Sequence, residues 1–175
     1  VRHFLRWQRT YEPITDQWIG ASSVFDALVS MATFRLNEDE AQEATIIDSS
    51  GVSYKARSIY HPFLGEKAVR NNFDIQNHEY YIITGANMAG KSTFLRTLGV
   101  NYILAMNGLP VFAEEMRVSV FRLFTNMRTT DDLTHGISYF NAELLRLKQL
   151  IASLDPNVPS LIILDEILKG TNSLD

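Results

Sequence analysis

The sequence of 175 residues contains no cysteine, so it can form neither a disulfide bond nor a thiolate metal site. It also has no excess of basic residues, because 16 lysines and arginines stand against 20 aspartates and glutamates, a formal net charge of −4. A domain that binds nucleic acid by itself usually has a basic face. We therefore expect any contact with nucleic acid to lie mainly in segments outside this chain.

Long apolar runs and targeting signals are also missing. No uninterrupted apolar run approaches the roughly 18 residues of a membrane span, so we expect no membrane partner. The chain begins with valine and has no signal-peptide pattern, which predicts that it is cut from a longer protein. The remaining composition, 46% apolar and 21% charged, is that of an ordinary soluble domain, and we expect a cytoplasmic location.

The first half of the chain predicts one helix and two short strands. Apolar residues recur at helical spacing over residues 18–36, whereas residues 1–17 have no pattern that assigns them. Residues 44–48 and 53–59 are rich in strand-forming types. The Ser-Ser-Gly sequence at 49–51 between them predicts a hairpin turn.

The second half alternates strands and helices, which predicts an α/β domain from about residue 72 onward. A short apolar run at 80–84 leads into a glycine. The other expected elements are a helix at 91–106 that stops at Asn107-Gly108, a strand at 118–126, a helix at 139–154 and a strand at 161–164. The last strand is wholly apolar, as is typical of strands buried on both faces of a parallel sheet.

Residues 85–92 read GANMAGKS and match the phosphate-binding pattern G-x-x-x-x-G-K-[ST]. Gly85 and Gly90 let the backbone fold around an anion with its N–H groups pointing inward. Lys91 supplies a positive charge for the β- and γ-phosphates, and the Ser92 hydroxyl is placed to bind Mg²⁺. Since the loop stands between an apolar run and a helix, it predicts a site for a nucleoside triphosphate and Mg²⁺.

Two adjacent acids, Asp165 and Glu166, end the apolar strand. One can hold Mg²⁺ while the other orients and deprotonates a water molecule. Taken alone, the pair would more often be a solvated strand end, but an upstream phosphate loop favours the catalytic interpretation. The acid pair also separates this chain from GTPases, which commonly position water with glutamine and recognise guanine through an N-K-x-D element that is missing here.

The loop and three other segments resemble the ATPase domain of the MutS family of DNA mismatch-repair proteins. Residues 84–93, TGANMAGKST, are similar to the family's TGPNMGGKST. Residues 131–140, DDLTHGISYF, resemble DDLASGRSTF, and Glu143 falls where the family keeps a glutamate. Residues 165–173, DEILKGTNS, resemble DEIGRGTST, and Tyr60-His61-Pro62 resembles the start of the same domain.

The resemblance implies an α/β fold, namely a P-loop NTPase of the ABC-ATPase type with a mixed sheet flanked by helices. Residues 1–45 would be the end of a helical lever and connector region. Residues 46–175 would be the P-loop ATPase domain, truncated at its C-terminal end after the D-loop.

The resemblance also assigns roles to individual residues. Glu166 would be catalytic, Ser92 and Asp165 would hold Mg²⁺, and Ser138 would reach the γ-phosphate of a partner subunit in a head-to-tail homodimer. Ser138 is equally suited to capping the helix that follows it. Nucleotide binding would fall to Gly85, Asn87, Met88, Ala89, Gly90, Lys91, Ser92 and Thr93.

Several departures from the family pattern indicate a divergent paralogue. Ile137 and Tyr139 replace an arginine and a threonine of the signature segment, and Leu168 replaces a glycine. Ala68 stands where the family stacks an aromatic ring on adenine, and Phe63 is a candidate substitute.

The resemblance implies an ATP-binding and ATP-hydrolysing module of a MutS-like DNA mismatch-repair or DNA-transaction protein. Closure of its dimer on nucleotide would be coupled to DNA binding through domains absent from this chain. The chain alone would be inactive or very weak. The alternatives are an ABC-type ATPase subunit of another system, such as a membrane transporter, and a non-catalytic, nucleotide-gated interaction module.

Overall fold

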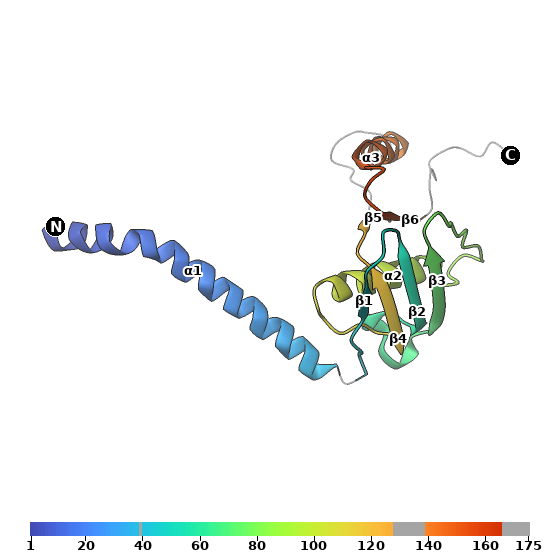
Figure 1. Cartoon of the computed structure of the whole chain (residues 1–175), viewed down its shortest axis with the longest axis horizontal. Helices are drawn as coiled ribbons and strands as arrows, with labels where there is room; N and C mark the ends of the chain where they lie inside the picture. Colours follow the sequence, from blue (N-terminus) through green and yellow to red (C-terminus); the bar gives the residue numbers. More distant parts are fainter. Residues whose placement is uncertain (39, 128–138, 166–175) are drawn as a thin grey trace. The chain divides into compact units, whose positions relative to one another are not determined.

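The computed structural model describes residues 1–38, 40–127 and 139–165. The chain divides into two compact units, Val1–Glu40 and Ala41–Asp175. The first unit is a single long helix, α1 (Arg2–Asn37), and the second combines two sheets with helices (Figure 1). The expected mixed α/β architecture is confirmed for the second unit.

Helix α1 is longer than the sequence pattern indicated, because residues 1–17 continue the helix expected at 18–36. One segment of α1, Ile14–Asn37, is long and apolar enough to cross a membrane when judged by length and composition, with a mean hydropathy of 1.2 over an 18-residue window. The sequence expectation concerned uninterrupted apolar runs, and Asp16, Asp26 and Arg35 interrupt this segment. A hydropathy averaged over 18 residues extends across such interruptions, so the two criteria give different results.

The larger sheet contains four strands in the order β1-β4-β2-β3. They are β1 (Thr45–Ile47), β2 (Ser53–Ile59), β3 (Asn71–Gln76) and β4 (Glu115–Ser119). Strand β4 pairs parallel with β1 and antiparallel with β2, so the hairpin expected between β1 and β2 was wrong. Met116 and Val118 of β4 are fully buried, and the central position gives that strand hydrogen-bonded neighbours on both sides.

The smaller sheet pairs β5 (Arg122–Asn126) with β6 (Ser160–Leu164) in parallel. The single strand expected at 118–126 is therefore two strands in different sheets, because the chain leaves the first sheet at Val120 and Phe121. The strand expected at 161–164 is confirmed. It is buried on one face only, since Leu161 and Ile163 are covered while Ile162 is 37% exposed.

The apolar run before the phosphate loop does not form the expected strand. Residues 79–86 form no regular secondary structure, and the side chains of Tyr80 and Ile82 are 83% and 78% exposed. A strand exists only where a neighbour completes its hydrogen bonds, and no strand in the described ranges pairs with this segment.

Helix α2 (Lys91–Met106) confirms the helix expected after the loop, including its stop at Asn107 and Gly108, where Gly108 has a φ of 67°. Helix α3 (Tyr139–Ser153) confirms the second expected helix. A short 3-10 segment, η1 (Pro62–Lys67), follows β2.

Buried polar groups fasten α2 to both sheets. The Tyr54 hydroxyl of β2 donates to the Leu98 carbonyl at 3.0 Å. The Tyr102 hydroxyl donates to the Phe121 carbonyl at 2.7 Å and accepts from the Phe121 N–H at 2.8 Å. The rings of Tyr102 and Phe121 stack with centroids 4.0 Å apart. Burial raises the pKa of both tyrosine hydroxyls, so both remain donors at neutral pH.

Asn101 provides a third attachment of α2. Its side chain is fully buried and accepts from the Phe112 N–H at 2.7 Å. Its amide group donates to the carbonyls of Tyr60 at 3.2 Å and Thr97 at 2.9 Å. Asn101 therefore holds the segment after β2 and the segment before β4 against the same helix.

We predict that Tyr102→Phe lowers the free energy of unfolding by about 1–3 kcal/mol, because it removes only the hydroxyl and leaves two buried groups of Phe121 unpaired. Urea denaturation of the chain measures the change. Tyr80→Phe is the matched control, since Tyr80 is exposed, and it should change stability by less than about 0.5 kcal/mol. Equal effects of the two substitutions would contradict this assignment.

Candidate nucleotide-binding site

The phosphate loop turns directly into α2 through glycine. Gly90 is the residue before the helix and has a φ of 91°, and Gly85 at the start of the loop has a φ of 156°. A Cβ atom on Gly90 would meet nothing within 4 Å, so the requirement for glycine lies in the backbone angle and not in space. Met88 adopts a φ of 63° and its side chain is fully exposed at the tip of the loop.

Lys91 closes the loop on itself. Its Nζ donates to the carbonyls of Gly85 and Ala86, both at 2.8 Å. No side chain caps the amino end of α2, where the first N–H groups have no partner within the helix. The loop therefore combines one ammonium group with free helix N–H groups, an arrangement that favours an anion.

A cavity of about 440 Å³ lies beside the loop. Gly90, Lys91 and Thr93 line one part of it, and His61 and Val69 line another. This volume is within the range typical of small-molecule sites. Of the expected nucleotide-binding residues, Ala89, Gly90, Lys91 and Thr93 border the cavity, whereas Gly85, Asn87, Met88 and Ser92 are not among the residues that line it.

His61, which the sequence motifs place at the start of the domain, lines this cavity. Its Nδ1 accepts from the Phe63 N–H at 3.3 Å, which leaves Nε2 to carry the proton. Burial, with the nearby positive charge of Arg96, lowers the pKa of His61, so the ring is neutral at pH 7. Phe63, the proposed substitute for the adenine-stacking ring, is 88% exposed and is not among the cavity residues.

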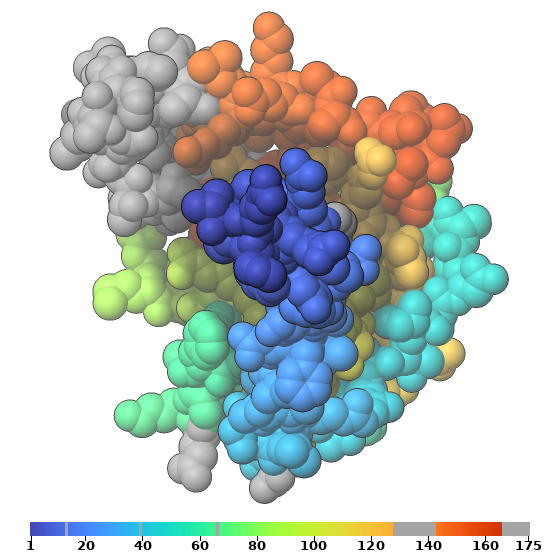
Figure 2. All heavy atoms as spheres, turned by 90° about the vertical axis from the view of Figure 1, so that its left-hand side faces the viewer, coloured from blue at the N-terminus to red at the C-terminus, as the bar shows by residue number. Residues whose placement is uncertain are grey.

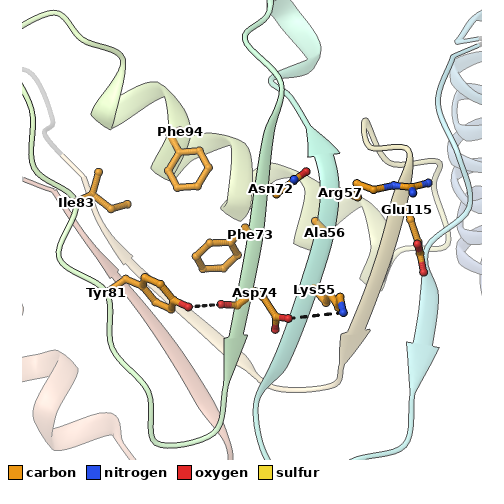
Figure 3. Close-up of a pocket in the computed structure, with 10 residues that line it drawn as sticks. All are labelled: Lys55, Ala56, Arg57, Asn72, Phe73, Asp74, Tyr81, Ile83, Phe94 and Glu115. Carbon is orange, nitrogen blue, oxygen red and sulfur yellow. Dashed lines mark hydrogen bonds and ion pairs between the residues drawn. The ribbon is translucent and has the colours of Figure 1, made fainter.

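Aromatic contacts fix the segment that leads into the loop. Tyr81 and Ile83 point toward Phe73 and Phe94 around a second cavity of about 560 Å³ (Figure 3). The ring of Phe73 lies 5.6 Å from that of Tyr81 and 5.9 Å from that of Phe94. The Tyr81 hydroxyl donates to the Asp74 carbonyl at 2.6 Å. Side-chain packing therefore positions residues 80–84, although they lack strand neighbours.

The amino end of α2 and the carboxyl end of β6 lie at the same edge of the domain. Tyr102, late in α2, bonds to Phe121 just before β5. A methyl group on Gly99, one turn earlier in α2, would lie 3.9 Å from side-chain atoms of both Leu123 and Thr125 within β5. Helix α2 thus runs antiparallel to β5 and to its parallel neighbour β6, as at ligand sites of other α/β sheets.

The donors at this edge fit Mg²⁺. Asp165 follows β6, is 8% exposed, and is held by its N–H, which donates to the Asn126 carbonyl at 2.9 Å. Ser92 is half-buried at the start of α2. A carboxylate and a hydroxyl are hard oxygen donors, and Mg²⁺ typically takes one or two protein ligands together with substrate phosphates. In the described ranges no cluster of three or more His, Cys, Asp or Glu residues offers a metal site built from protein alone.

Two expected site residues, Glu166 and Ser138, lie outside the described residues. So do Ile137 and Leu168, two of the positions at which the sequence departs from the family pattern. Glu143 of α3, which matches a family glutamate, is buried, and its Oε2 has no hydrogen-bond partner within the described part of the chain. The described part therefore brings together the phosphate loop, Ser92 and the edge that carries Asp165.

The domain is a mixed α/β scaffold in which a loop with glycines at positive φ leads into the first turn of a helix. This arrangement is typical of phosphate-binding domains. The profile of the family MutS domain V matches residues 81–175. The chain is 33% identical over 174 residues to the DNA mismatch repair protein MutS of Syntrophomonas wolfei, an alignment that covers 94% of this chain and 20% of that protein. The MutS of Bartonella quintana is 35% identical over 162 residues, covering 84% of this chain and 18% of that protein.

The chain therefore belongs to the MutS domain V family, the family of the MutS ATPase domain. This confirms the resemblance read from the sequence motifs. The chain spans about a fifth of the length of these curated relatives.

We predict opposite effects for two glycine substitutions in and after the loop. Gly90→Ala should destabilise the domain by about 1–2 kcal/mol, because alanine is strained at a φ of 91°. Gly99→Ala should be neutral or stabilise it by up to about 1 kcal/mol, because the helix gains propensity and the new methyl group has room. Thermal unfolding of both variants measures the signs, and a stabilising Gly90→Ala would contradict the loop geometry.

Proposed function

We propose that this chain is the ATP-binding and ATP-hydrolysing module of a MutS-like protein that acts in DNA mismatch repair or another DNA transaction. The observation that carries the proposal is the loop of residues 85–92, in which Lys91 reaches across the loop at the uncapped end of α2 beside a nucleotide-sized cavity.

Lys91 is proposed to exchange its two carbonyl partners for the β- and γ-phosphates of ATP. The backbone N–H groups of Gly90, Lys91 and Ser92 would then complete the phosphate cradle. Ser92 and Asp165 would hold Mg²⁺, which supplies neutralising charge to the phosphate oxygens when bound. The proposed base is Glu166, which orients and deprotonates the attacking water.

The rest of the proposed mechanism concerns a longer protein. The ATPase domain, residues 46–175, is proposed to be of the ABC type and to close as a homodimer, with Ser138 of one subunit meeting the γ-phosphate bound by the other. Residues 1–45 would connect it to domains that bind DNA. The named relatives are DNA mismatch repair proteins, which supports DNA as the partner.

A non-catalytic, nucleotide-gated interaction module is a second candidate. The replacements Ile137, Tyr139 and Leu168 in the signature and D-E-I segments favour it. Asp165 and Glu166 favour hydrolysis, and ATP turnover by the longer protein, with and without duplex DNA, separates the two.

We predict that Lys91→Ala weakens ATP binding by the chain roughly 10- to 100-fold, since hydrogen bonds to charged groups contribute about 1.5–3 kcal/mol each. Isothermal titration calorimetry measures the change. Lys148→Ala removes the same charge from an exposed position on α3 and should leave the affinity unchanged. Unchanged affinity in a folded Lys91→Ala variant would rule out the phosphate-loop assignment.

In the longer protein, Glu166→Gln should lower ATP turnover about 10²- to 10⁴-fold while ATP still binds, because the substitution removes only the base. The closed dimer should then persist with Mg-ATP. Adding Ser138→Arg should prevent dimerisation, since it places bulk and charge where the partner's γ-phosphate enters. Light scattering reports both results. A dimer unaffected by Ser138→Arg would show that the signature serine does not act across the interface.

A further inference from the structure

The cavity of about 440 Å³ beside the phosphate loop is lined by two different parts of the chain. Gly90, Lys91 and Thr93 line it where the loop enters α2, and residues of the segment 61–72 line another part of it. With the phosphates of a nucleotide on the loop, as proposed above, the rest of the cavity is left for the nucleoside. The nucleoside then lies against the segment 61–72.

The segment 61–72 begins next to a residue that the fold holds in place. The Tyr60 N–H donates to the Phe112 carbonyl at 2.9 Å, and the Tyr60 carbonyl accepts from the buried side chain of Asn101 at 3.2 Å. His61 follows directly and precedes η1, whose mint-green atoms lie at the surface at the lower left of Figure 2. The backbone of His61 is therefore fixed beside α2 by contacts that involve no ligand.

The His61 ring has one nitrogen in use and one that can donate to a ligand. Its Nδ1 accepts from the Phe63 N–H at 3.3 Å, and the two rings pack edge to face with centroids 5.5 Å apart. Burial and the nearby charge of Arg96 lower the pKa of His61, so the ring is neutral at pH 7 and its hydrogen is on Nε2. No acceptor among the described residues bonds to this Nε2–H. His61 therefore brings an unused donor to the cavity.

The other side chains in this part of the cavity are suited to the flat, apolar faces of a base. Leu64 and Val69 border the cavity and are 44% and 76% exposed, so their apolar surface is accessible to a ligand. Phe94 also borders the cavity, but its ring packs against Phe73 with centroids 5.9 Å apart. Apolar walls with a few well-placed polar groups are typical of small-molecule sites.

We propose that His61 binds the base of the nucleotide, its Nε2–H donating to a ring nitrogen of a purine. This inference rests on the function proposed above and deepens it. The edge of a purine carries acceptor nitrogens, whereas its faces are apolar and pack against Leu64 and Val69. His61 then holds one end of the nucleotide, and Lys91 holds the phosphates at the other end.

Isothermal titration calorimetry of the chain with ATP and with inorganic tripolyphosphate, each with Mg²⁺, tests the proposal. His61→Asn keeps an acceptor for the Phe63 N–H but removes the Nε2–H. It should lower the affinity for ATP roughly 3- to 10-fold, the contribution of one hydrogen bond, and leave the affinity for tripolyphosphate unchanged.

His78→Asn is the matched control. It makes the same change in an exposed turn, at a φ of 65° that asparagine tolerates, and should alter neither affinity. Lys91→Ala should lower both affinities, since both ligands present phosphates to the loop.

The 1-deaza, 3-deaza and 7-deaza analogues of ATP identify the bonded nitrogen. The analogue that lacks this nitrogen should bind to the wild-type chain about as weakly as ATP binds to His61→Asn. His61→Asn should bind that analogue no more weakly than it binds ATP, because the two changes remove the same hydrogen bond.

Each alternative has its own result. Unchanged ATP affinity in His61→Asn would overturn the proposal and leave His61 only as the cap of η1. Equal losses of affinity for ATP and tripolyphosphate would place the donor on a phosphate, and additive losses with every deaza analogue would place it on the sugar; both would overturn the proposal. So would a wild-type chain that binds ATP no more tightly than tripolyphosphate. Failure of the proposed function is distinct, because Lys91→Ala would then leave both affinities unchanged.

Discussion

The attachment of helix α2 to both sheets is the constraint on which the candidate site depends. Tyr54 bonds the middle of α2 to the larger sheet. Tyr102, near the end of α2, bonds to Phe121, the residue just before β5 of the smaller sheet. These bonds are buried, so breaking one leaves unpaired polar groups in the core. The phosphate loop leads into the amino end of the same helix and takes its position from these contacts farther along α2.

Lys91 contacts the loop in the structure and is proposed to contact the nucleotide as well. Its ammonium donates to two loop carbonyls, which joins the end of the loop to its beginning. ATP binding would exchange these bonds for bonds to phosphate, and only the difference between the two sets would contribute to affinity. A loop already curved would lose little conformational freedom on binding, which favours the bound state.

The signals that predicted correctly are local to one element. The loop glycines, the bounds of α2 and the apolar strand β6 could each be read from neighbouring residues. The errors concern pairing between distant segments. Nothing between residues 44 and 59 shows that β4 separates β1 from β2, and nothing in residues 80–84 shows that a neighbour is missing. The place of His61 beside the phosphate loop could not be read from the sequence, because the cavity that it lines is assembled by three separate segments.

The central place of β4 in the larger sheet has a consequence for the order of synthesis. Strands β1 and β2 leave the ribosome first but are not each other's partners. They stay without their shared neighbour until the loop, α2 and β4 itself have followed. Contacts between segments so far apart in the sequence form slowly. Strand edges that are still unpaired favour aggregation during this time. The edges of β1 and β2 that pair with β4 therefore remain exposed on the nascent chain while the phosphate loop and α2 are synthesised.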